Sequence, residues 1–462
     1  MKTIYPISKI FIFITTLFMA ASCDSFVEVD TPKSQLISPA VFEDYQTADA
    51  ALTDIYSSIR NKGILTGYGS GISNTLGNYA DEIRSVENPN NPSLSFYNNL
   101  LLASNSSVAV YWNASYNQIY AANSIIEGSS TSKTLTADQK KHLRAEALFI
   151  RALLHFYIIN LFGDAPFISQ TDYKINSIAV RTPIEKVYQS IIRDLEEAVV
   201  LLPENYYSTE RVRPNKFVAA ALLARVYLYT MSYAEASNTA SEVINKNELY
   251  QLEPQLSNVF SLDSKEAIWQ LQAGTSGQNT LEASFFTFSP GPPSQVYLNN
   301  NLVDSFNPAD QRLSSWIKAV QNGNNLWYQP YKYKENIPTP ASKEYSIVFR
   351  LAEQYLIRAE ARAQQGDLIG AKEDLDKIRN RAGLAKTAAS SKNEIIAAVL
   401  QERRWELFTE YGHRFFDLKR NAMLDIELRD VKKGWNSTDS LFPVPESELS
   451  TNPNLRPQNP GY

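Results

Sequence analysis

The residue types that most often carry catalysis are sparse in this chain of 462 residues. Its only histidines are His142, His155 and His413, and the first two are 13 residues apart in one expected helix, so they do not lie side by side. No H-E-x-x-H motif occurs, and one cysteine cannot form a cysteine-based metal set. The glycine-rich segment Gly67-Tyr-Gly-Ser-Gly71 matches neither a dinucleotide-binding motif nor a P-loop, and it predicts a flexible loop. We therefore expect no catalytic residue, no metal site and no cofactor.

Carboxylates are numerous, with 49 Asp and Glu, so the paired acids of a glycoside hydrolase are one possibility to weigh. Asp81-Glu82 is the most suggestive pair in a loop, although a solvated loop or a hydrogen-bond acceptor for a substrate explains it more simply. A second set of charged residues, near the end of the chain, contains both acidic and basic side chains at helical spacing. No nucleophile or metal ligand accompanies them. The set predicts buried or half-buried ion pairs that tie helices together. It consists of Glu402, Arg403, Glu406, Arg414, Asp417 and Arg420.

Binding a sugar needs aromatic rings for its apolar face and polar side chains for its hydroxyl rim. Two long stretches between the helical blocks, 64–109 and 252–345, supply both, and their aromatic content argues against disorder. The alternative is that these aromatic side chains anchor the loops to the core, as we expect for Trp112 within a helix. The candidates for stacking are Trp316, Trp327, Tyr328 and Tyr331, and the candidates from the first stretch are Asn78, Tyr79, Asp81 and Arg84.

Helical periodicity dominates the segments that must position these loops. Apolar residues recur at three-to-four spacing in 142–162, behind a capping box at Thr136 and Gln139. Thr182-Pro183 with Glu185 predicts another helix start, and Ser391 with Glu394 a third. The expected helices are 48–60, 110–126, 142–162, 183–202, 216–229, 233–245, 346–364, 368–382 and 393–411.

An internal repeat relates 220–245 to 355–380 at an offset of 135 residues. In each copy two helices flank a tight turn, and small residues such as Ala224 and Ala359 recur where helices must approach closely. This pattern favours tetratricopeptide-like helix pairs, about four of them packed side by side, because such a unit buries its faces only against neighbours. Two unrelated helical hairpins are the alternative.

Cys23, the one cysteine, ends a segment that is typical of a lipoprotein signal peptide. Lys2 and Lys9 form a basic start, an apolar stretch too short to span a bilayer follows, and small residues precede Cys23. We expect residues 1–22 to be removed and Cys23 to carry lipid, enough for stable anchoring. A plain secretory peptide followed by an unmodified thiol is the alternative.

The charge balance argues against a nucleic-acid partner. The net charge is −5, and it becomes −7 without residues 1–22, which hold two Lys and no acid. No stripe of Lys and Arg compensates for this, so we expect no nucleic-acid binding. A content of 44% hydrophobic residues suffices for a large core, in two or three domains or in one helical array.

Several segments, in order, resemble the SusD/RagB lipoproteins, which are the nutrient-binding partners of SusC-like TonB-dependent transporters. These segments are 26–32 behind Cys23, 111–123, 144–166, 350–361, 378–384, 402–420 and 459–462. The resemblance implies a mainly α fold of four tetratricopeptide-like helix pairs with a loop-rich ligand-binding region. It places a signal peptide in 1–22 and one domain in 23–462, with helical parts 23–250 and 346–462 around a loop-rich insertion, 251–345.

The resemblance further implies a non-enzymatic lipoprotein in the outer membrane, facing the cell exterior, that delivers a glycan or oligosaccharide to a SusC-like transporter. Ligand residues vary within the family, so none is assigned by a motif. Three alternatives remain: a peptide-binding relative, a surface glycoside hydrolase and a helical scaffold without a small ligand.

Overall fold

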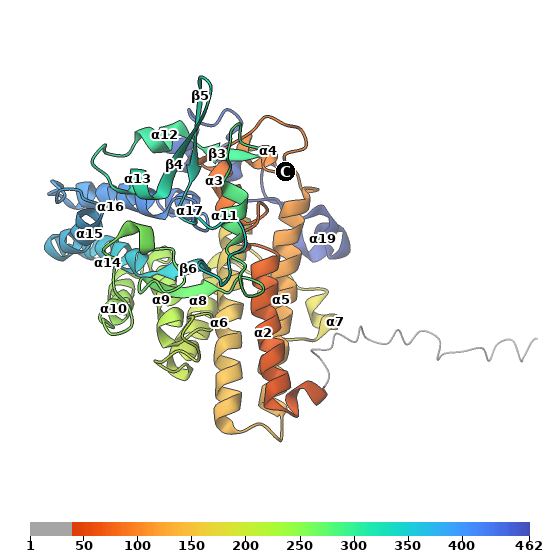
Figure 1. Ribbon diagram of the computed structural model, residues 1–462. Helices are drawn as coiled ribbons and strands as arrows, with labels where there is room; N and C mark the ends of the chain where they lie inside the picture. Colours follow the sequence, from red (N-terminus) through yellow and green to blue (C-terminus); the bar gives the residue numbers. More distant parts are fainter. Residues whose placement is uncertain (1–38) are drawn as a thin grey trace, which may run out of the picture.

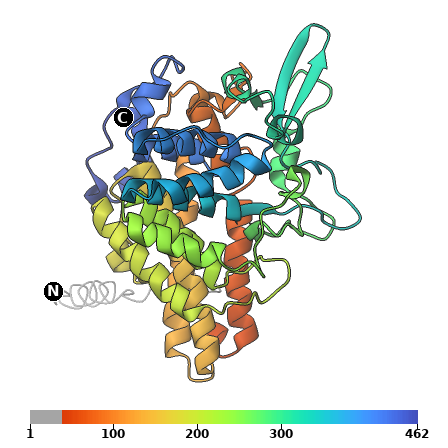
Figure 2. The same cartoon turned by 90° about the vertical axis from the view of Figure 1, so that its left-hand side faces the viewer.

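Helices are the main secondary structure of the computed structural model, which describes residues 39–462 (Figure 1). Lipidation of Cys23 and removal of residues 1–22 concern residues outside this range. Along the chain, each long helix packs against a neighbour, so that the helices form one continuous array (Figure 2). They are α2 (Tyr45–Asn61), α5 (Ser106–Thr131), α6 (Ala137–Phe162), α8 (Ile184–Leu201), α9 (Lys216–Tyr229), α10 (Tyr233–Ile244), α14 (Leu351–Gln365), α15 (Leu368–Arg381) and α16 (Lys392–Leu407).

The most apolar of these helices, α6, runs through the centre of the core. Its length and composition would let it cross a membrane, but its apolar stretch is entirely buried inside the protein. The predicted capping box is confirmed, because Thr136 Oγ1 accepts from Gln139 N while Gln139 Oε1 accepts from Thr136 N at 2.9 Å. Gly163, with φ +72°, ends the helix.

The start of α8 differs from the prediction. Pro183 occupies the N-cap position, and Thr182 makes no capping hydrogen bond there. Instead the backbone N–H of Ile184 donates to Asp164 Oδ1 at 2.9 Å, so a residue from the preceding loop does the capping. The capping box of Ser391 and Glu394 at the start of α16 is confirmed.

The two copies of the repeat form the helix pairs α9–α10 and α14–α15, and α10 packs directly on α14. The matched alanines Ala224 and Ala359, like Ala236 and Ala371, are fully buried. Small side chains therefore lie where the helices approach closely, as the repeat predicts. That these pairs are tetratricopeptide units stays a prediction.

The loop-rich stretches contain short elements that the sequence did not reveal. Three antiparallel strand pairs form: β1 (Ile83–Ser85) with β3 (Val296–Leu298), β2 (Ala267–Leu271) with β6 (Ser346–Arg350), and β4 (Ile317–Asn322) with β5 (Asn325–Pro330). The β4–β5 hairpin projects from the body (Figure 2). The shorter helices are α3 (Ile72–Tyr79), α4 (Leu94–Tyr97), α7 (Tyr173–Asn176), α11 (Leu281–Phe286), α12 (Asn300–Asp304), α13 (Arg312–Trp316), α17 (His413–Arg420), α18 (Leu424–Leu428) and α19 (Glu446–Thr451), with 3-10 turns at Pro39–Phe42, Leu256–Asn258, Ser437–Ser440 and Pro453–Leu455.

Several predicted helices have other ends in the structure: those expected at 110–126 and 142–162 extend over Ser106–Thr131 and Ala137–Phe162. Two further differences have a tertiary cause. The segment 346–350 is strand β6, buried on both faces, because its apolar and β-branched residues pair with β2. Helix α16 ends at Leu407 and not at residue 411, since Thr409 and Tyr411 adopt positive φ. Their backbone N–H groups donate to Glu82 Oε2 and Ser73 Oγ, so tertiary hydrogen bonds replace the last helical turn.

A buried network of ion pairs ties the loop-rich stretch to the helical array, and the structural role predicted for the charged group of 402–420 is confirmed. Arg312 is fully buried and contacts Asp310 and Glu402 at 2.7 Å and Glu406 at 2.9 Å. Arg350 contacts Glu406 at 2.5 Å. Further pairs join Arg403 to Asp417, Arg414 to Asp81, Arg420 to Glu360, and Arg225 to Glu353.

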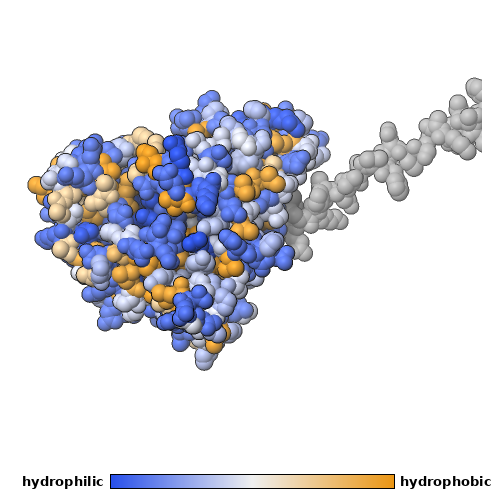
Figure 3. All heavy atoms as spheres, turned by 90° about the horizontal axis from the view of Figure 1, so that it is seen from above, coloured by the Kyte–Doolittle hydropathy of each residue, from blue (hydrophilic) through white to orange (hydrophobic). Residues whose placement is uncertain are grey.

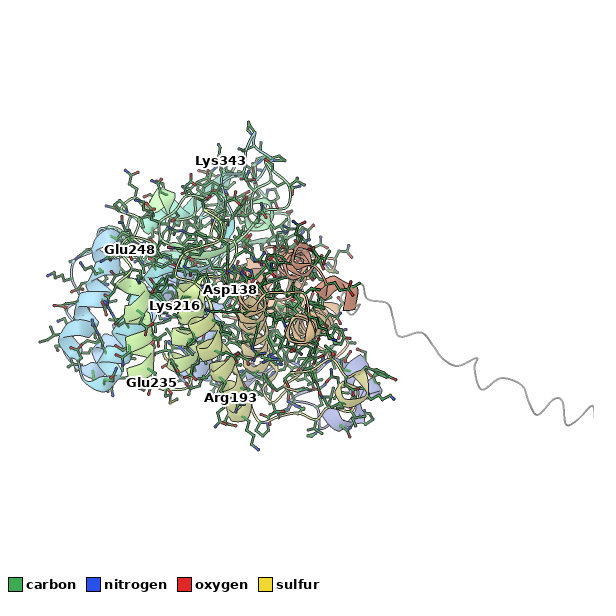
Figure 4. The ribbon with its side chains drawn as sticks, turned by 90° about the horizontal axis from the view of Figure 1, so that it is seen from below. Asp138, Arg193, Lys216, Glu235, Glu248 and Lys343 are labelled. Carbon is green, nitrogen blue, oxygen red and sulfur yellow. The ribbon has the colours of Figure 1, made fainter. Side chains whose placement is uncertain are left out.

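The loops gather on one side of the array. In the view from below, Lys343 of the loop-rich stretch and Arg193 of α8 lie at opposite edges (Figure 4). At the top of Figure 1, β3, α4 and the β4–β5 hairpin are neighbours, and β3 contacts β5. Residues far apart in the sequence are thereby brought to one end of the molecule.

A candidate ligand-binding pocket

A pocket of about 360 Å³ opens at this end, in the size range of small-ligand sites. We call it the Arg84 pocket. Four segments that are distant in the sequence contribute to it: strand β1 with the residues behind it, helix α4, the start of α12, and the loop after α18. Its lining residues are Arg84, Glu87, Tyr97, Asn98, Asn299, Asn301, Val431, Lys432, Lys433 and Gly434.

The pairing of β1 with β3 builds one wall. Ile83 and Leu298 are opposite each other and buried, so strand alternation turns their neighbours Arg84 and Tyr297 to the other face. The Arg84 guanidinium lies 5.9 Å from the centroid of the Tyr297 ring, within the range of a cation–π interaction. Asn299 continues this wall and donates its backbone N–H to Glu82 O at 2.8 Å. A charged group and a half-exposed ring are therefore held side by side.

Tyr97 and Lys432 also line the pocket, and Tyr97 is a direct neighbour of Arg84. Tyr97 ends α4 and is half-buried. Lys432 Nζ lies 4.2 Å from the centroid of the Tyr97 ring and donates to the carbonyl oxygen of Asn78. Burial lowers the pKa of Lys432 to about 7, and Arg84 lowers it too, against the opposing charge of Asp81. Lys432 thus fixes one face of the ring and leaves the rest of Tyr97 available to a ligand.

Two other cavities lack this combination. The cleft of about 370 Å³ between α16, α17 and α18 has no aromatic lining, and its charged residues Arg404, Arg414 and Asp417 already form ion pairs. A cavity of about 210 Å³ beside Arg60 also lacks aromatic residues. Seen from above, the surface at the loop-rich end is mostly hydrophilic with small, separate hydrophobic patches (Figure 3). A polar ligand with an apolar face suits such a surface better than an apolar one.

The structure brings Arg84 into the pocket but places other predicted site residues in the interior. Tyr79 is fully buried, with its ring packed edge-on against Phe96, Phe415, Trp435 and Phe442. Trp316 is fully buried, and its indole N–H donates to Leu256 O at 2.9 Å. Tyr79 and Trp316 therefore stabilise the core, and the prediction that they touch a ligand is wrong.

Asp81 is also a structural residue, which corrects its assignment as a ligand contact. Its carboxylate accepts from Arg404 at 2.7 Å and from Arg414 at 2.9 Å. Burial raises the pKa of Asp81, but the two guanidinium groups outweigh it and hold the pKa below its ordinary value. Asn78, fully buried, bonds to Asn74 and Ser85. Neither side chain reaches the surface.

The pKa of the neighbouring acid Glu82 is shifted in the opposite direction, above its ordinary value. Burial and then the negative charge of Asp81 raise its pKa from 4.5 to about 7. Only 2% of Glu82 and 4% of Asp81 is exposed, so this pair does not offer the accessible carboxylates that glycoside hydrolysis needs. Within residues 39–462, no three His, Cys, Asp or Glu side chains are arranged to hold a metal ion.

Of the remaining candidates, Trp327 and Tyr328 belong to strand β5, and Tyr331 directly follows it. The half-buried ring of Trp327 packs against Gly291, where an added Cβ would lie 2.6 Å from Cζ3. Tyr328 points to the other face of the hairpin, because its partner in register is Ala319 and that of Trp327 is Val320. Tyr331 lies beside Lys318, whose Nζ is 4.9 Å from the ring centroid. Trp327, Tyr328 and Tyr331 are partly accessible, but they do not form one stacking surface.

Sequence reasoning missed most of the pocket. Tyr97 and Tyr297 belong to the aromatic loop residues, yet nothing in the sequence places both of them beside Arg84. Lys432 and Lys433 are a pair of adjacent basic residues before Gly434. Such pairs are common on protein surfaces and did not indicate a site. A long-range strand pairing, β1 with β3, creates the site, and this pairing has no local sequence signal.

The whole chain is similar to characterised proteins. Residues 38–228 match the family model described as "Starch-binding associating with outer membrane", and residues 311–462 match the model described as "SusD family". The SusD-like protein P25 of Formosa agariphila is 26% identical, covering 97% of this chain and 98% of that protein. The starch-binding protein SusD of Bacteroides thetaiotaomicron is 26% identical, covering 73% of this chain and 74% of that protein.

Solved structures show the same fold. A SusD superfamily protein from Bacteroides vulgatus superposes with a TM-score of 0.79 at 20% identity, covering 91% of this chain and all of that one. A laminarin-binding SusD-like protein superposes with a TM-score of 0.77 at 24% identity, covering 90% of this chain and 99% of that one. The predicted fold class, mainly α with a loop-rich region, is confirmed.

Proposed function

Because the chain belongs to the SusD/RagB family, we propose that it is a cell-surface protein that binds a glycan or oligosaccharide without cleaving it. The observation that carries the proposal is the Arg84 pocket, in which the ring of Tyr97 lies near a polar rim and Arg84 lies against the ring of Tyr297. Rings of this kind pack on the apolar face of a sugar, and Arg, Asn and Lys side chains bond its hydroxyls.

Two features beyond the shared fold support a glycan as the ligand. Relatives named for what they bind include a starch-binding protein and a laminarin-binding protein, and both belong to the same family. In this chain the pocket rim contributes three amides, from Asn98, Asn299 and Asn301, which can donate and accept at once, as sugar hydroxyls require. The absence of catalysis is part of the proposal, supported by the burial of Asp81 and Glu82.

Affinity gel electrophoresis of the mature chain tests the proposal, with one polysaccharide in each gel. We expect at least one polysaccharide to retard the protein and Tyr97→Ala to abolish the retardation. The exposed α10 variant Glu235→Ala, on another surface of the molecule, serves as the control (Figure 4). The same polysaccharide, incubated for a long time with the protein, should show no increase in reducing ends. Turnover abolished by a single carboxylate substitution would instead identify a hydrolase.

Membrane attachment through Cys23 also belongs to the proposal. Family membership and the order of basic, apolar and small residues before the only cysteine support it. We expect Cys23→Ala to fold normally but to lose both its fatty-acid label and its place in the outer-membrane fraction. Label that persists in this variant would contradict lipidation at Cys23.

The proposed partner is a SusC-like TonB-dependent transporter, which receives the glycan. A row of exposed apolar residues suits such a partner: Tyr173 is 62% exposed, Ile175 50%, Ile178 63% and Val180 62%. The row is held in place, because Asn454 Nδ2 donates to Ile178 O and Asn452 Nδ2 to Ala179 O. It also lies close to the start of the described chain, since Thr171 and Phe42 line one cavity.

Copurification tests this surface. The full-length protein and its transporter are expressed together and purified through a tag on the transporter. Ile178→Ser/Val180→Ser should reduce the recovered amount, while Ile426→Ser, an exposed apolar residue at 74% on α18, should not. Equal recovery of the double variant would place the contact elsewhere.

A further inference from the structure

The Arg84 pocket is positively charged, although the chain as a whole is acidic. Its lining includes Arg84, Lys432 and Lys433 but only one acid, Glu87. The full chain has 44 basic and 49 acidic residues, so an excess of bases in one small pocket contrasts with the average. A neutral sugar does not require this local charge.

Of these three bases only Lys432 is buried, whereas Arg84 and Lys433 are exposed. Within residues 39–462, none of them forms a salt bridge, whereas Arg312, Arg350 and Arg414 each contact two or more carboxylates. Of the nearby acids, Asp81 is already bound to Arg404 and Arg414, and Glu87 acts on Arg84 without forming a salt bridge. The positive charge of the pocket is therefore available to a ligand.

The position of Lys432 strengthens this conclusion. Only 4% of the residue is exposed, and its partners are a carbonyl oxygen and the Tyr97 ring, neither of which carries a full negative charge. Placing a cation in such surroundings costs free energy, which is why burial lowers its pKa to about 7. A bound anion near Lys432 and Arg84 would offset that cost.

We propose that the Arg84 pocket selects an anionic sugar, with a carboxylate or sulfate group held by Arg84, Lys432 and Lys433 and a sugar ring packed against Tyr97 or Tyr297. The inference rests on the proposed function and adds the class of ligand. Arg84 suits such a group because its planar guanidinium offers paired N–H donors to two oxygens of one anion. Glu87 at the rim accepts from sugar hydroxyls.

The test compares acidic and neutral polysaccharides with the mature chain. The probes for carboxylates are alginate and polygalacturonate, the probe for sulfate esters is carrageenan, and the neutral probes are starch, laminarin and galactomannan. In affinity gels we expect retardation by at least one anionic probe and by none of the neutral ones. Since screening weakens contacts between accessible charges, added salt should reduce this retardation. Retardation by alginate or polygalacturonate would identify a carboxylate as the recognised group, and retardation by carrageenan would identify a sulfate ester.

Matched variants locate the charge requirement. Arg84→Gln/Lys433→Gln should weaken binding of the responding probe at least about tenfold, and Lys433→Gln alone should weaken it measurably. Lys433 is exposed, so its replacement leaves the fold intact. The control Lys141→Gln/Arg193→Gln removes the same charge from exposed positions on α6 and α8, and it should bind like the wild type. Thermal melting of each variant verifies folding.

The outcomes separate the two proposals. Retardation by a neutral probe that is lost in Tyr97→Ala would uphold glycan binding at this pocket and overturn the selection of an anion. Binding of the anionic probe that is equally weak in Arg84→Gln/Lys433→Gln and in Lys141→Gln/Arg193→Gln would also overturn the selection of an anion by this pocket. The loss would then follow the total charge of the protein. A chain that none of the six probes retards would contradict the inference and the proposed function together.

Discussion

Replacing Glu82 by Gln should stabilise the protein at alkaline pH and leave it unchanged in acid. Glu82 is fully buried, its Oε2 accepts from Thr409 N at 3.2 Å, and its Oε1 has no hydrogen-bond partner. Burial and Asp81 raise the pKa of Glu82 from 4.5 to about 7, so the folded protein holds a proton that the unfolded chain has lost. A Gln amide keeps the acceptor for Thr409 and carries no charge at any pH.

The magnitude follows from the difference between the two pKa values. Multiplying the interval from 4.5 to about 7 by about 1.4 kcal/mol per pKa unit gives about 3 kcal/mol. The raised pKa favours folding fully below pH 4.5. This contribution decreases as the pH rises and is lost above pH 7. Glu82→Gln removes the dependence, so its advantage over the wild type should grow from near zero at about pH 4.5 to about 3 kcal/mol at about pH 8.

The assay is urea unfolding followed by circular dichroism at several pH values between these limits, on the wild type, Glu82→Gln and Asp81→Asn. The neighbouring residue is the matched control of opposite sign, because Arg404 and Arg414 hold the pKa of Asp81 low. Breaking that buried pair should cost about 3–5 kcal/mol at neutral pH. A Glu82→Gln variant that is less stable than the wild type at about pH 8, or whose advantage does not change with pH, would refute the reasoning.

Two further predictions concern stability. Arg312→Ala should lower the free energy of unfolding by about 3–5 kcal/mol, because it leaves buried carboxylates unpaired. Arg144→Ala should lower it by less than about 1 kcal/mol, since Arg144 is 39% exposed beside Glu197. Urea unfolding of both variants measures the difference. Trp112→Ala should cost about 3–5 kcal/mol as a packed core aromatic and leave binding intact, while Trp327→Ala should mainly weaken glycan binding. Calorimetric titration and thermal melting measure both quantities, and normal binding by a much less stable Trp327→Ala would make Trp327 a loop anchor.

Local sequence patterns predicted the helical array well because helix periodicity and caps are local. The helix Lys216–Tyr229 has the predicted ends, and two of the three predicted capping boxes form. The errors arise where distant residues intervene. Asp164 caps α8 in place of Thr182, and the contacts of Thr409 and Tyr411 with Glu82 and Ser73 end α16 early.

The candidate site was less predictable for the same reason. An aromatic residue in an apparent loop can stack on a ligand or pack in the core, and only its surroundings decide. Tyr79 is in the core because all of α3 is buried, and Trp316 is one of two buried residues of α13; the many polar residues of both helices concealed this. Arg84 was identified correctly as a polar surface residue, but its partners Tyr97, Tyr297 and Lys432 come from three other segments. The excess of basic side chains in the pocket could not be predicted, because it arises only when these segments come together.

Calorimetric titration of the polysaccharide that most retards the protein, into the wild type and into Tyr97→Ala/Tyr297→Ala, tests most directly whether the chain binds a glycan in the Arg84 pocket. Both rings are half-buried at the surface, so we expect the double variant to melt as cooperatively as the wild type. Its affinity should be at least about tenfold lower, a loss of about 1.4 kcal/mol in binding free energy. Unchanged affinity in the folded double variant would contradict the assignment of the site.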